Sequence, residues 1–218
     1  MNLTTVIFDM DGLLIDSEPL WNEAVCDVFK NYDIYLDKKQ LSYTTGLRTK
    51  EFIEWWFTYF KIDLKEVANA ETKIIALVTD KIINYGRAQA GLSHILNFFI
   101  TRKFKIGLAS SSPEPLINTV IDYLGIRSPF QAISSAAELK YGKPHPEVYL
   151  ECASKLDSSP RECLAFEDSF NGMIAVKAAK MKCVVVPASW QLNDLRWQTA
   201  DLKISSLQNF NELLLNTL

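Results

Sequence analysis

Strand-like and helix-like segments alternate through the second half of this chain, and this alternation limits its possible folds more than any other feature. Short apolar runs that suit strands stand at 105–109, 131–134, 163–166 and 183–186, and an earlier one stands at 6–8. Segments with apolar residues at helical spacing separate them. Strands that are apolar on both faces and are joined by helices form parallel sheets with helices on both sides. The sequence therefore predicts an α/β protein with a doubly wound parallel sheet of the Rossmann-like kind.

The stretch between the first two of these strands breaks the alternation, because residues 16–85 read as helical throughout. Asp16 and Ser17 suit a helix start, and Pro19 suits a first turn. A later helix over 50–60 is aromatic nearly all round, so we expect it to be covered on more than one side. We predict a small all-helical cap domain over 16–86, inserted after the first strand. The catalytic core then comprises residues 1–15 and 87–218.

Polar and charged side chains follow the predicted strands at the points where the strands end. These residues are Asp9, Asp11, Ser110, Ser111, Lys143, Glu167 and Asp168. Parallel sheets bind ligands beyond the carboxyl ends of their strands, where the strand order reverses. We therefore expect these side chains to share one site, and the helical segment to hang over it as a lid.

Two aspartates separated by one residue concentrate negative charge that repels itself unless a cation lies nearby. Mg2+ is one explanation for Asp9 and Asp11, and an ordinary acidic turn is another. If a phosphate ester binds here, Asp9 is placed to attack phosphorus and form an aspartyl phosphate. Asp11 is placed to act as general acid and then as general base. Asp168 supplies a further carboxylate for Mg2+, with Glu167 beside it as a ligand or as a support for the ligands.

The remaining polar residues suit the binding of a phosphoryl group. Ser110 offers a hydroxyl, and the backbone amides that follow it stand at a helix N-terminus that favours anions. Lys143 adds a positive charge for the phosphoryl oxygens and for keeping Asp9 ionised. Each feature also has an ordinary explanation, as a helix cap or a solvated lysine. Their convergence at the strand ends of one sheet favours phosphoryl transfer.

Four segments of the chain resemble the signature motifs of the haloacid dehalogenase (HAD) superfamily. They are FDMDG at 8–12, GLASSS at 107–112, GKPHP at 142–146 and FEDSFNG at 166–172. The run GLLIDSEP at 12–19 resembles the sugar-phosphatase branch. Within that branch the chain is most similar to bacterial 2-deoxyglucose-6-phosphate phosphatases, also called hexitol phosphatases, and more distantly to beta-phosphoglucomutase.

The resemblance implies roles for the acidic residues and a cofactor. Asp9 would be the nucleophile and a Mg2+ ligand. Asp11 would be the acid and base, and its backbone carbonyl would also bind Mg2+. Asp168 would be a further metal ligand, supported by Glu167. Dehalogenases proper lack the second aspartate of the first motif and use no metal, so Asp11 argues for phosphate rather than halide.

The resemblance also implies which residues meet the substrate. Ser110, the amide of Ser111 and Lys143 would hold the transferring phosphoryl group, and the helical insertion would correspond to a cap of the C1 type. Arg48 falls where cap residues of related enzymes touch the substrate, so it is our candidate for specificity. Trp21 stands where the mutase carries a histidine, which argues against mutase activity.

The composition of the chain limits the kinds of molecule that it is expected to bind. A net charge of -3 without long runs of one sign excludes the usual footprint of a nucleic-acid binder. The apolar helix over 92–100 is too short to span a bilayer, and the first residues show no secretory leader. The four cysteines are far apart and suit a reducing compartment. We expect a cytoplasmic monomer that binds neither nucleic acid nor membranes.

The function predicted from the sequence is that of a Mg2+-dependent phosphatase. Its substrates would be small sugar phosphates, namely hexose or hexitol 6-phosphates such as 2-deoxyglucose 6-phosphate. One alternative is a sugar phosphomutase of the beta-phosphoglucomutase type. An alternative of another class is a non-catalytic protein that binds phosphorylated metabolites.

Overall fold

A six-stranded parallel sheet forms the centre of the computed structural model, which describes residues 3–218. Residues 1–2, the start of the predicted core segment and of the stretch read for a leader, lie outside this range. The strand order is β3-β2-β1-β4-β5-β6. Strands β2 and β3 are added on one side of β1 and strands β4 to β6 on the other, so the strand order reverses at β1. The strands are β1 (Thr5–Phe8), β2 (Lys105–Ser110), β3 (Ala132–Ser135), β4 (Cys163–Glu167), β5 (Lys182–Val185) and β6 (Leu202–Lys203). The predicted doubly wound parallel sheet is confirmed.

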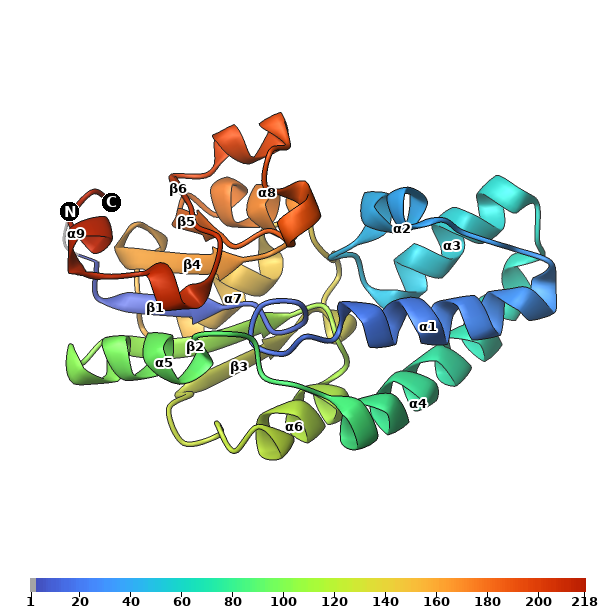
Figure 1. Ribbon diagram of the computed structural model, residues 1–218, viewed down its shortest axis with the longest axis horizontal. Coiled ribbons are helices and arrows are strands. Elements are labelled where there is room, and N and C mark those ends of the chain that lie inside the picture. Colours follow the sequence, from blue (N-terminus) through green and yellow to red (C-terminus); the bar gives the residue numbers. More distant parts are fainter. Residues whose placement is uncertain (1–2) are drawn as a thin grey trace.

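Helices cover both faces of this sheet, and a further group of helices stands beyond the carboxyl ends of its strands (Figure 1). The α-helices are α1 (Glu18–Phe29), α2 (Lys38–Thr44), α3 (Thr49–Phe60), α4 (Val67–Tyr85), α5 (Leu92–Thr101), α6 (Glu114–Tyr123), α7 (Glu147–Lys155), α8 (Phe170–Ala178) and α9 (Glu212–Leu215). Among residues 3–218, no helix combines the length and the apolar character needed to cross a membrane.

Side chains alternate across β1 and divide the core into two layers. Val6 and Phe8 point into a cluster that includes the buried faces of α5 and α6, whereas Ile7 points into a cluster formed with α7 and α8. This alternation is the period of two that a strand imposes. Because both faces of β1 are fully buried, its register against β2 and β4 is fixed, and so is the position of the residue that follows it.

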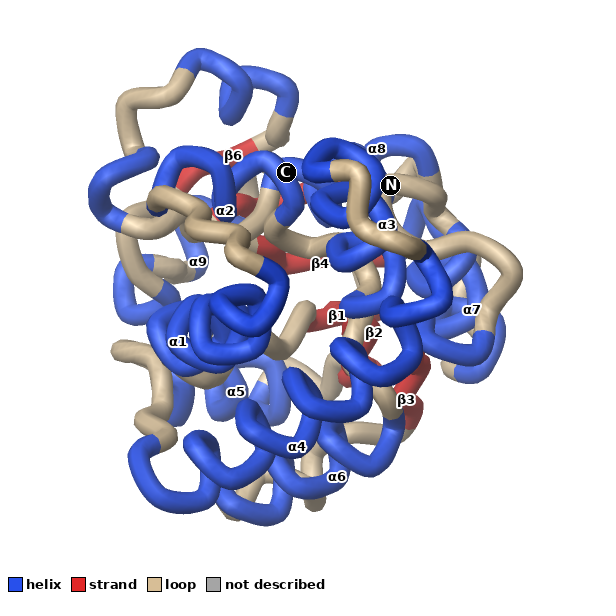
Figure 2. The backbone as a smooth tube through the Cα atoms, turned by 90° about the vertical axis from the view of Figure 1, so that its right-hand side faces the viewer, coloured by secondary structure: helices blue, strands red, loops and turns tan. Residues whose placement is uncertain are grey.

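Helices α1 to α4 pack together beyond the carboxyl ends of the strands, and Figure 2 shows them in front of the strand ends. The main contacts within the group join α4 to α1 and to α3. Two adjacent chain segments connect this group to the sheet: Ile15 pairs with Ala88, and the amide of Asp16 donates to the carbonyl of Arg87 at 2.8 Å. The helical insertion after β1 thus enters and leaves through one double-stranded linker.

Three features differ from the sequence-based expectations. Helix α2 has its own capping box at Asp37, a short element that apolar spacing did not reveal. The edge strand β6 was also missed, because only two residues form it. We expected helix α3 to be covered by other segments on more than one side. This expectation is wrong for Trp55, which is 59% exposed. Trp56, on the neighbouring face, is 4% exposed and belongs to the core.

Candidate active site

Asp9 directly follows β1, and the sheet fixes its position. Its amide continues the ladder by donating to the carbonyl of Phe166 at 3.0 Å. Its side chain is buried, with 8% exposed. The chain then turns at Gly12, whose φ is +77°. A Cβ there would lie 2.0 Å from a carboxylate oxygen of Asp168, so glycine is required both for the turn and for the approach of Asp168.

Lys143 reaches Asp9 from the loop between β3 and α7. Its Nζ is 2.5 Å from Oδ1 of Asp9 and 2.6 Å from Oε1 of Glu167, and it also donates to the carbonyl of Ala109 at 3.2 Å. Burial by itself lowers the pKa of the Lys143 ammonium, but the two carboxylates outweigh burial and raise it. The lysine is therefore charged at neutral pH and holds one oxygen of Asp9 in place.

Glu167, the last residue of β4, is fully buried and anchors this ion pair. Besides Lys143, its Oε1 accepts from the Tyr149 hydroxyl at 2.7 Å. Its Oε2 accepts from the Asp168 amide at 3.1 Å, and from the amide and hydroxyl of Ser169 at 3.0 and 2.9 Å. Five donors thus occupy the two oxygens, and this arrangement suits a support for Lys143 better than a metal ligand.

Asp168 follows Glu167 and faces Asp9 across the sheet edge. Oxygens of Asp9, Glu167 and Asp168 lie within 4.8 Å of one another. Burial, together with the other carboxylates, raises the pKa of Asp9 and of Asp168 above the ordinary aspartate range. Within residues 3–218, Lys143 is the one cation that forms ion pairs with this cluster, so an excess of negative charge is left over. The carboxylate oxygens of buried Asp9 and half-buried Asp168, together with this excess, fit a hard cation such as Mg2+.

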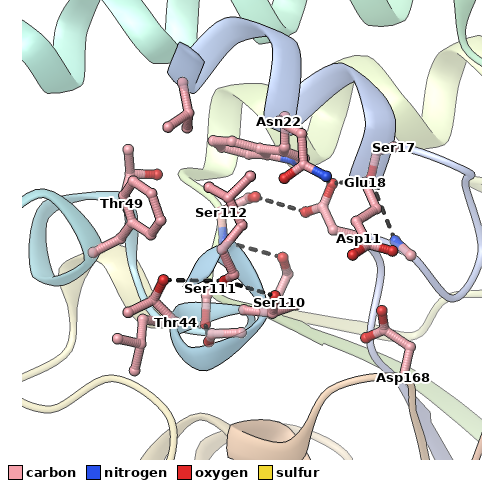
Figure 3. A pocket seen from close by; sticks show the side chains of 18 of the residues that line it. Asp11, Ser17, Glu18, Asn22, Thr44, Thr49, Ser110, Ser111, Ser112 and Asp168 are labelled. Atoms are coloured by element: carbon pink, nitrogen blue, oxygen red, sulfur yellow. Dashed lines mark hydrogen bonds between the residues drawn. The ribbon is translucent and has the colours of Figure 1, made fainter. Parts of the chain in front are cut away.

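The Asp11 side chain has different partners from Asp9, although the two residues belong to one short motif. Its Oδ1 accepts from the Ser17 hydroxyl at 2.7 Å and from the Trp21 indole N–H at 2.9 Å, and its Oδ2 accepts from the Ser112 hydroxyl at 2.7 Å. Figure 3 shows Ser17 and Ser112 on either side of Asp11. Asp11 is absent from the carboxylate cluster around Asp9. The two aspartates therefore have distinct environments, one beside Lys143 and one among neutral donors.

The three serines at the end of β2, Ser110 to Ser112, line the same cavity as the aspartates. Ser110 is buried, and its hydroxyl accepts from the amide of Ser112 at 3.1 Å. The Ser111 hydroxyl donates to the carbonyl of Gly46, in the loop before α3, at 2.7 Å. Ser112 and Trp21 were not identified from the sequence as partners of Asp11. The third serine of the GLASSS motif was the available signal for Ser112, whereas the Trp21 contact depends on how α1 docks.

Comparison with known proteins agrees with this geometry. Residues 6–186 match the family model described as haloacid dehalogenase-like hydrolase. Hexitol phosphatase B of Escherichia coli (strain K12) is 39% identical over 206 residues, which cover 94% of this chain and 93% of that protein. The chain belongs to the haloacid dehalogenase-like hydrolase family.

Two beta-phosphoglucomutases share less sequence with this chain. Beta-phosphoglucomutase of Bacillus subtilis is 28% identical over 191 residues, covering 84% of this chain and 83% of that protein. The crystal structure of beta-phosphoglucomutase from Clostridium difficile superposes with a TM-score of 0.85 at 25% identity, covering 98% of this chain and 96% of that chain. The predicted superfamily and the assignment as a phosphatase are confirmed.

Arg48, Lys143 and Glu167 do not line the cavity, but Lys143 reaches it through its ion pair with Asp9, and Glu167 supports Lys143. Arg48 has no such contact with the aspartates. It stands at the start of α3, and its guanidinium donates to the carbonyls of Leu139 at 2.8 Å and Ala136 at 3.3 Å. It also forms an ion pair with Glu51 at 2.5 Å. These contacts join the helical group to the loop after β3. The structure thus brings Asp9, Asp11, Ser110, Ser111, Lys143, Glu167 and Asp168 together, and it leaves Arg48 at the rim.

Proposed function

We propose that this HAD hydrolase is a Mg2+-dependent phosphatase of small sugar phosphates, acting through an aspartyl phosphate. The observation that carries the proposal is the contrast between its two aspartates. Asp9 is buried beside Lys143, whereas Asp11 is held by neutral donors across the same cavity. The similarity to hexitol phosphatase B supports hexose or hexitol 6-phosphates, such as 2-deoxyglucose 6-phosphate, as the substrates.

In the first half-reaction, a carboxylate oxygen of Asp9 attacks phosphorus, and the bond between phosphorus and the sugar oxygen breaks. Asp11 donates its proton to that oxygen, so the sugar leaves as an alcohol. In the second half-reaction, Asp11 takes a proton from water, and the water oxygen attacks the aspartyl phosphate. Inorganic phosphate leaves, and both aspartates regain their starting states.

The other residues neutralise and position the phosphoryl group. Asp9, Asp168 and the backbone carbonyl of Asp11 would hold Mg2+, which when bound offsets the charge shared by carboxylates and phosphoryl oxygens. Ser110 and the amide of Ser111 are placed to hold the phosphoryl oxygens at the start of α6. Glu167 keeps Lys143 in place, because five hydrogen bonds fix its carboxylate.

The donors around Asp11 decide which of its oxygens carries the proton. The indole N–H of Trp21 can only donate, so Oδ1 stays an acceptor in both protonation states. The hydroxyl of Ser112 can donate to the ionised carboxylate or accept from the protonated one. The proton therefore resides on Oδ2, the oxygen next to Ser112. Trp21, which replaces the histidine of the mutase, acts here as a positioning residue for the acid.

Residues 16–86 are proposed to act as the lid of this site. They join the core through the paired segments at Ile15 and Ala88, which suits a hinge. Contacts between Gly46 and Ser111, and between Thr45 and the side chain of Asn171, hold the helical group against the core beside the cavity. Arg48 contributes to the same closure, and we propose that it acts as a latch.

Phosphate release from a panel of hexose, hexitol, pentose and triose phosphates tests this function, with Mg2+ and with a chelator. We expect hexose and hexitol 6-phosphates to be hydrolysed, chelator to abolish activity, and Asp9→Asn to reduce turnover by at least about 1,000-fold. Activity that survives in Asp9→Asn would refute its role as nucleophile. Conversion of a sugar 6-phosphate to its 1-phosphate without free phosphate would show a mutase instead.

A further inference from the structure

Tyr149 contacts both members of the ion pair that holds Asp9 in place. It lies in the first turn of α7, and its side chain is fully buried. Its hydroxyl donates to Oε1 of Glu167 at 2.7 Å, and Nζ of Lys143 donates to the same oxygen at 2.6 Å. The Lys143 Nζ also lies over the Tyr149 ring, 5.0 Å from its centroid. The loop and helix that follow β3 thus bring an ammonium and a hydroxyl to one carboxylate oxygen.

Packing alone does not explain this tyrosine. Its ring belongs to the buried cluster that contains Ile7, Ala109 and Cys183 on one face of the sheet. A phenylalanine would fill the same space without a hydroxyl group, whose removal from water has to be offset. Here a hydrogen bond to a charged group offsets it, and that group is the carboxylate that also holds Lys143. The hydroxyl therefore serves the ion pair, whereas the ring also serves the core.

The hydrogen bonds of Lys143 show why the ion pair needs this support. A lysine ammonium has three N–H donors, and here their acceptors are Asp9, Glu167 and the carbonyl of Ala109. Because the lysine stem is flexible, the ammonium stays against Asp9 only while its other acceptors keep their positions. Strand β2 fixes the carbonyl of Ala109, but a glutamate carboxylate can rotate about its last torsion. Within residues 3–218, Tyr149 is the one donor besides Lys143 that reaches Oε1 of Glu167.

Resting on the proposed function, we propose that Tyr149 is a positioning residue for phosphoryl transfer. Its hydroxyl fixes Oε1 of Glu167, and its ring face attracts the Lys143 ammonium through a cation–π contact. Together these contacts hold Lys143 at Oδ1 of Asp9. Positioning and charge neutralisation provide most of the rate in phosphoryl transfer, so a small displacement of Lys143 slows the attack by Asp9. Tyr149 does not line the cavity, so it acts through Lys143 and Glu167 and not on the sugar.

Two substitutions of Tyr149 separate its hydroxyl from its ring. Tyr149→Phe removes the hydroxyl and keeps the ring, and kcat for a hexitol 6-phosphate should fall by about tenfold, with KM within about threefold of wild type. Tyr149→Leu removes the ring face as well, and kcat should fall by about 100-fold. Asp9 is the nucleophile of the first half-reaction and the leaving group of the second, so kcat falls whichever half-reaction is slower. The same factors are expected with p-nitrophenyl phosphate, because the effect lies on the phosphoryl side.

Tyr32→Phe is the matched control. The Tyr32 hydroxyl donates to Oε2 of Glu66 at 3.2 Å, so this variant also removes a bond between a tyrosine and a carboxylate. Tyr32 lies within the helical group and does not line the cavity, so kcat and KM should stay within about twofold of wild type. Urea denaturation measures the stability of each variant, so that rates are compared between folded proteins.

Three results would overturn the role of Tyr149. They are a folded Tyr149→Phe variant with wild-type kcat, a rise in KM without a fall in kcat, and a Tyr149→Phe variant that does not fold. The last result would show that the hydroxyl serves stability alone. If the wild-type enzyme releases no phosphate from any substrate, including p-nitrophenyl phosphate, the proposed phosphatase function is wrong instead.

Discussion

Replacing Gly172 by alanine has two opposing effects on stability. It improves the helix propensity of α8, and it disturbs the buried hydrogen bonds of the Glu167 carboxylate. Gly172 lies in the first turn of α8, where alanine should stabilise the helix by up to about 1 kcal/mol. A Cβ on Gly172, however, would lie 1.7 Å from Oε1 and 1.9 Å from Cδ of Glu167. The Glu167 carboxylate cannot yield easily, because it is fully buried and five donors hold it.

The hydrogen bonds of the Glu167 carboxylate determine how much Gly172→Ala should destabilise the protein. Moving the carboxylate away from Gly172 breaks its bonds with Lys143 and Tyr149, both at Oε1. A hydrogen bond to a charged group contributes about 1.5–3 kcal/mol, so two such bonds amount to about 3–6 kcal/mol. After the gain in helix propensity, Gly172→Ala should lower the free energy of unfolding by about 2–5 kcal/mol. Lys143 also loses its anchor, so turnover should fall by about tenfold or more.

Urea denaturation and initial rates of phosphate release measure the two effects. Gly125→Ala is the control, since Gly125 has a φ of +65° and a Cβ added there would meet no neighbouring atom within 4 Å. Its substitution should cost only the left-handed backbone strain, about 1–2 kcal/mol, and leave turnover intact. The reasoning is refuted if Gly172→Ala stabilises the protein, or if it matches Gly125→Ala in both measurements.

Four further changes have defined outcomes. Lys143→Met leaves two buried carboxylates without their cation, so it should cost about 3–5 kcal/mol in urea denaturation and abolish phosphate release. Trp21→Phe removes one donor to the acid, and steady-state kinetics should show kcat falling about tenfold with little change in KM. Arg48→Ala should raise KM by a similar factor on every substrate if Arg48 is a latch; a change confined to some substrates would identify a specificity residue. Without Mg2+, the raised pKa values of Asp9 and Asp168 make the folded protein bind protons more tightly than the unfolded chain, whose aspartates titrate near 3.8. The free energy of unfolding should then fall as pH rises from about 4 toward neutrality, and saturating Mg2+ should flatten the slope; equal slopes with and without Mg2+ would argue against the metal site.

The Mg2+ result separates two explanations that the sequence left open. An acidic turn needs no cation and predicts no effect of Mg2+ on stability. A metal site predicts that Mg2+ stabilises the protein by binding the folded state, and that stabilisation grows with pH because protons must leave the carboxylates first. Asp168→Asn should remove this response while leaving the Lys143 contact with Asp9 in place.

The exposed aromatic face of α3 shows that the apolar spacing in the sequence could not predict which side of this helix is buried. Trp55 and Trp56 are adjacent and chemically identical, and their spacing placed both on apolar stripes. Only the packing of α3 against the rest of the helical group buries Trp56, which donates to the Thr44 hydroxyl at 3.1 Å, while Trp55 points outward. A helix that is apolar all round does not by itself say which of its faces has a neighbour.

The sequence by itself determined the parallel sheet, the helical insertion after β1, and the carboxylates and serines at the strand ends. These features follow from local rules: side-chain periodicity sets the elements, and the strand ends set where the following residues lie. Only the tertiary structure decided which side chains contact one another in and around the site. Trp21 reaches Asp11 only because α1 docks beside the cavity, and Arg48 turns to the loop after β3 instead of the cavity. Glu18 lines the cavity because α1 begins there, and such contacts depend on distances between segments that no local pattern encodes.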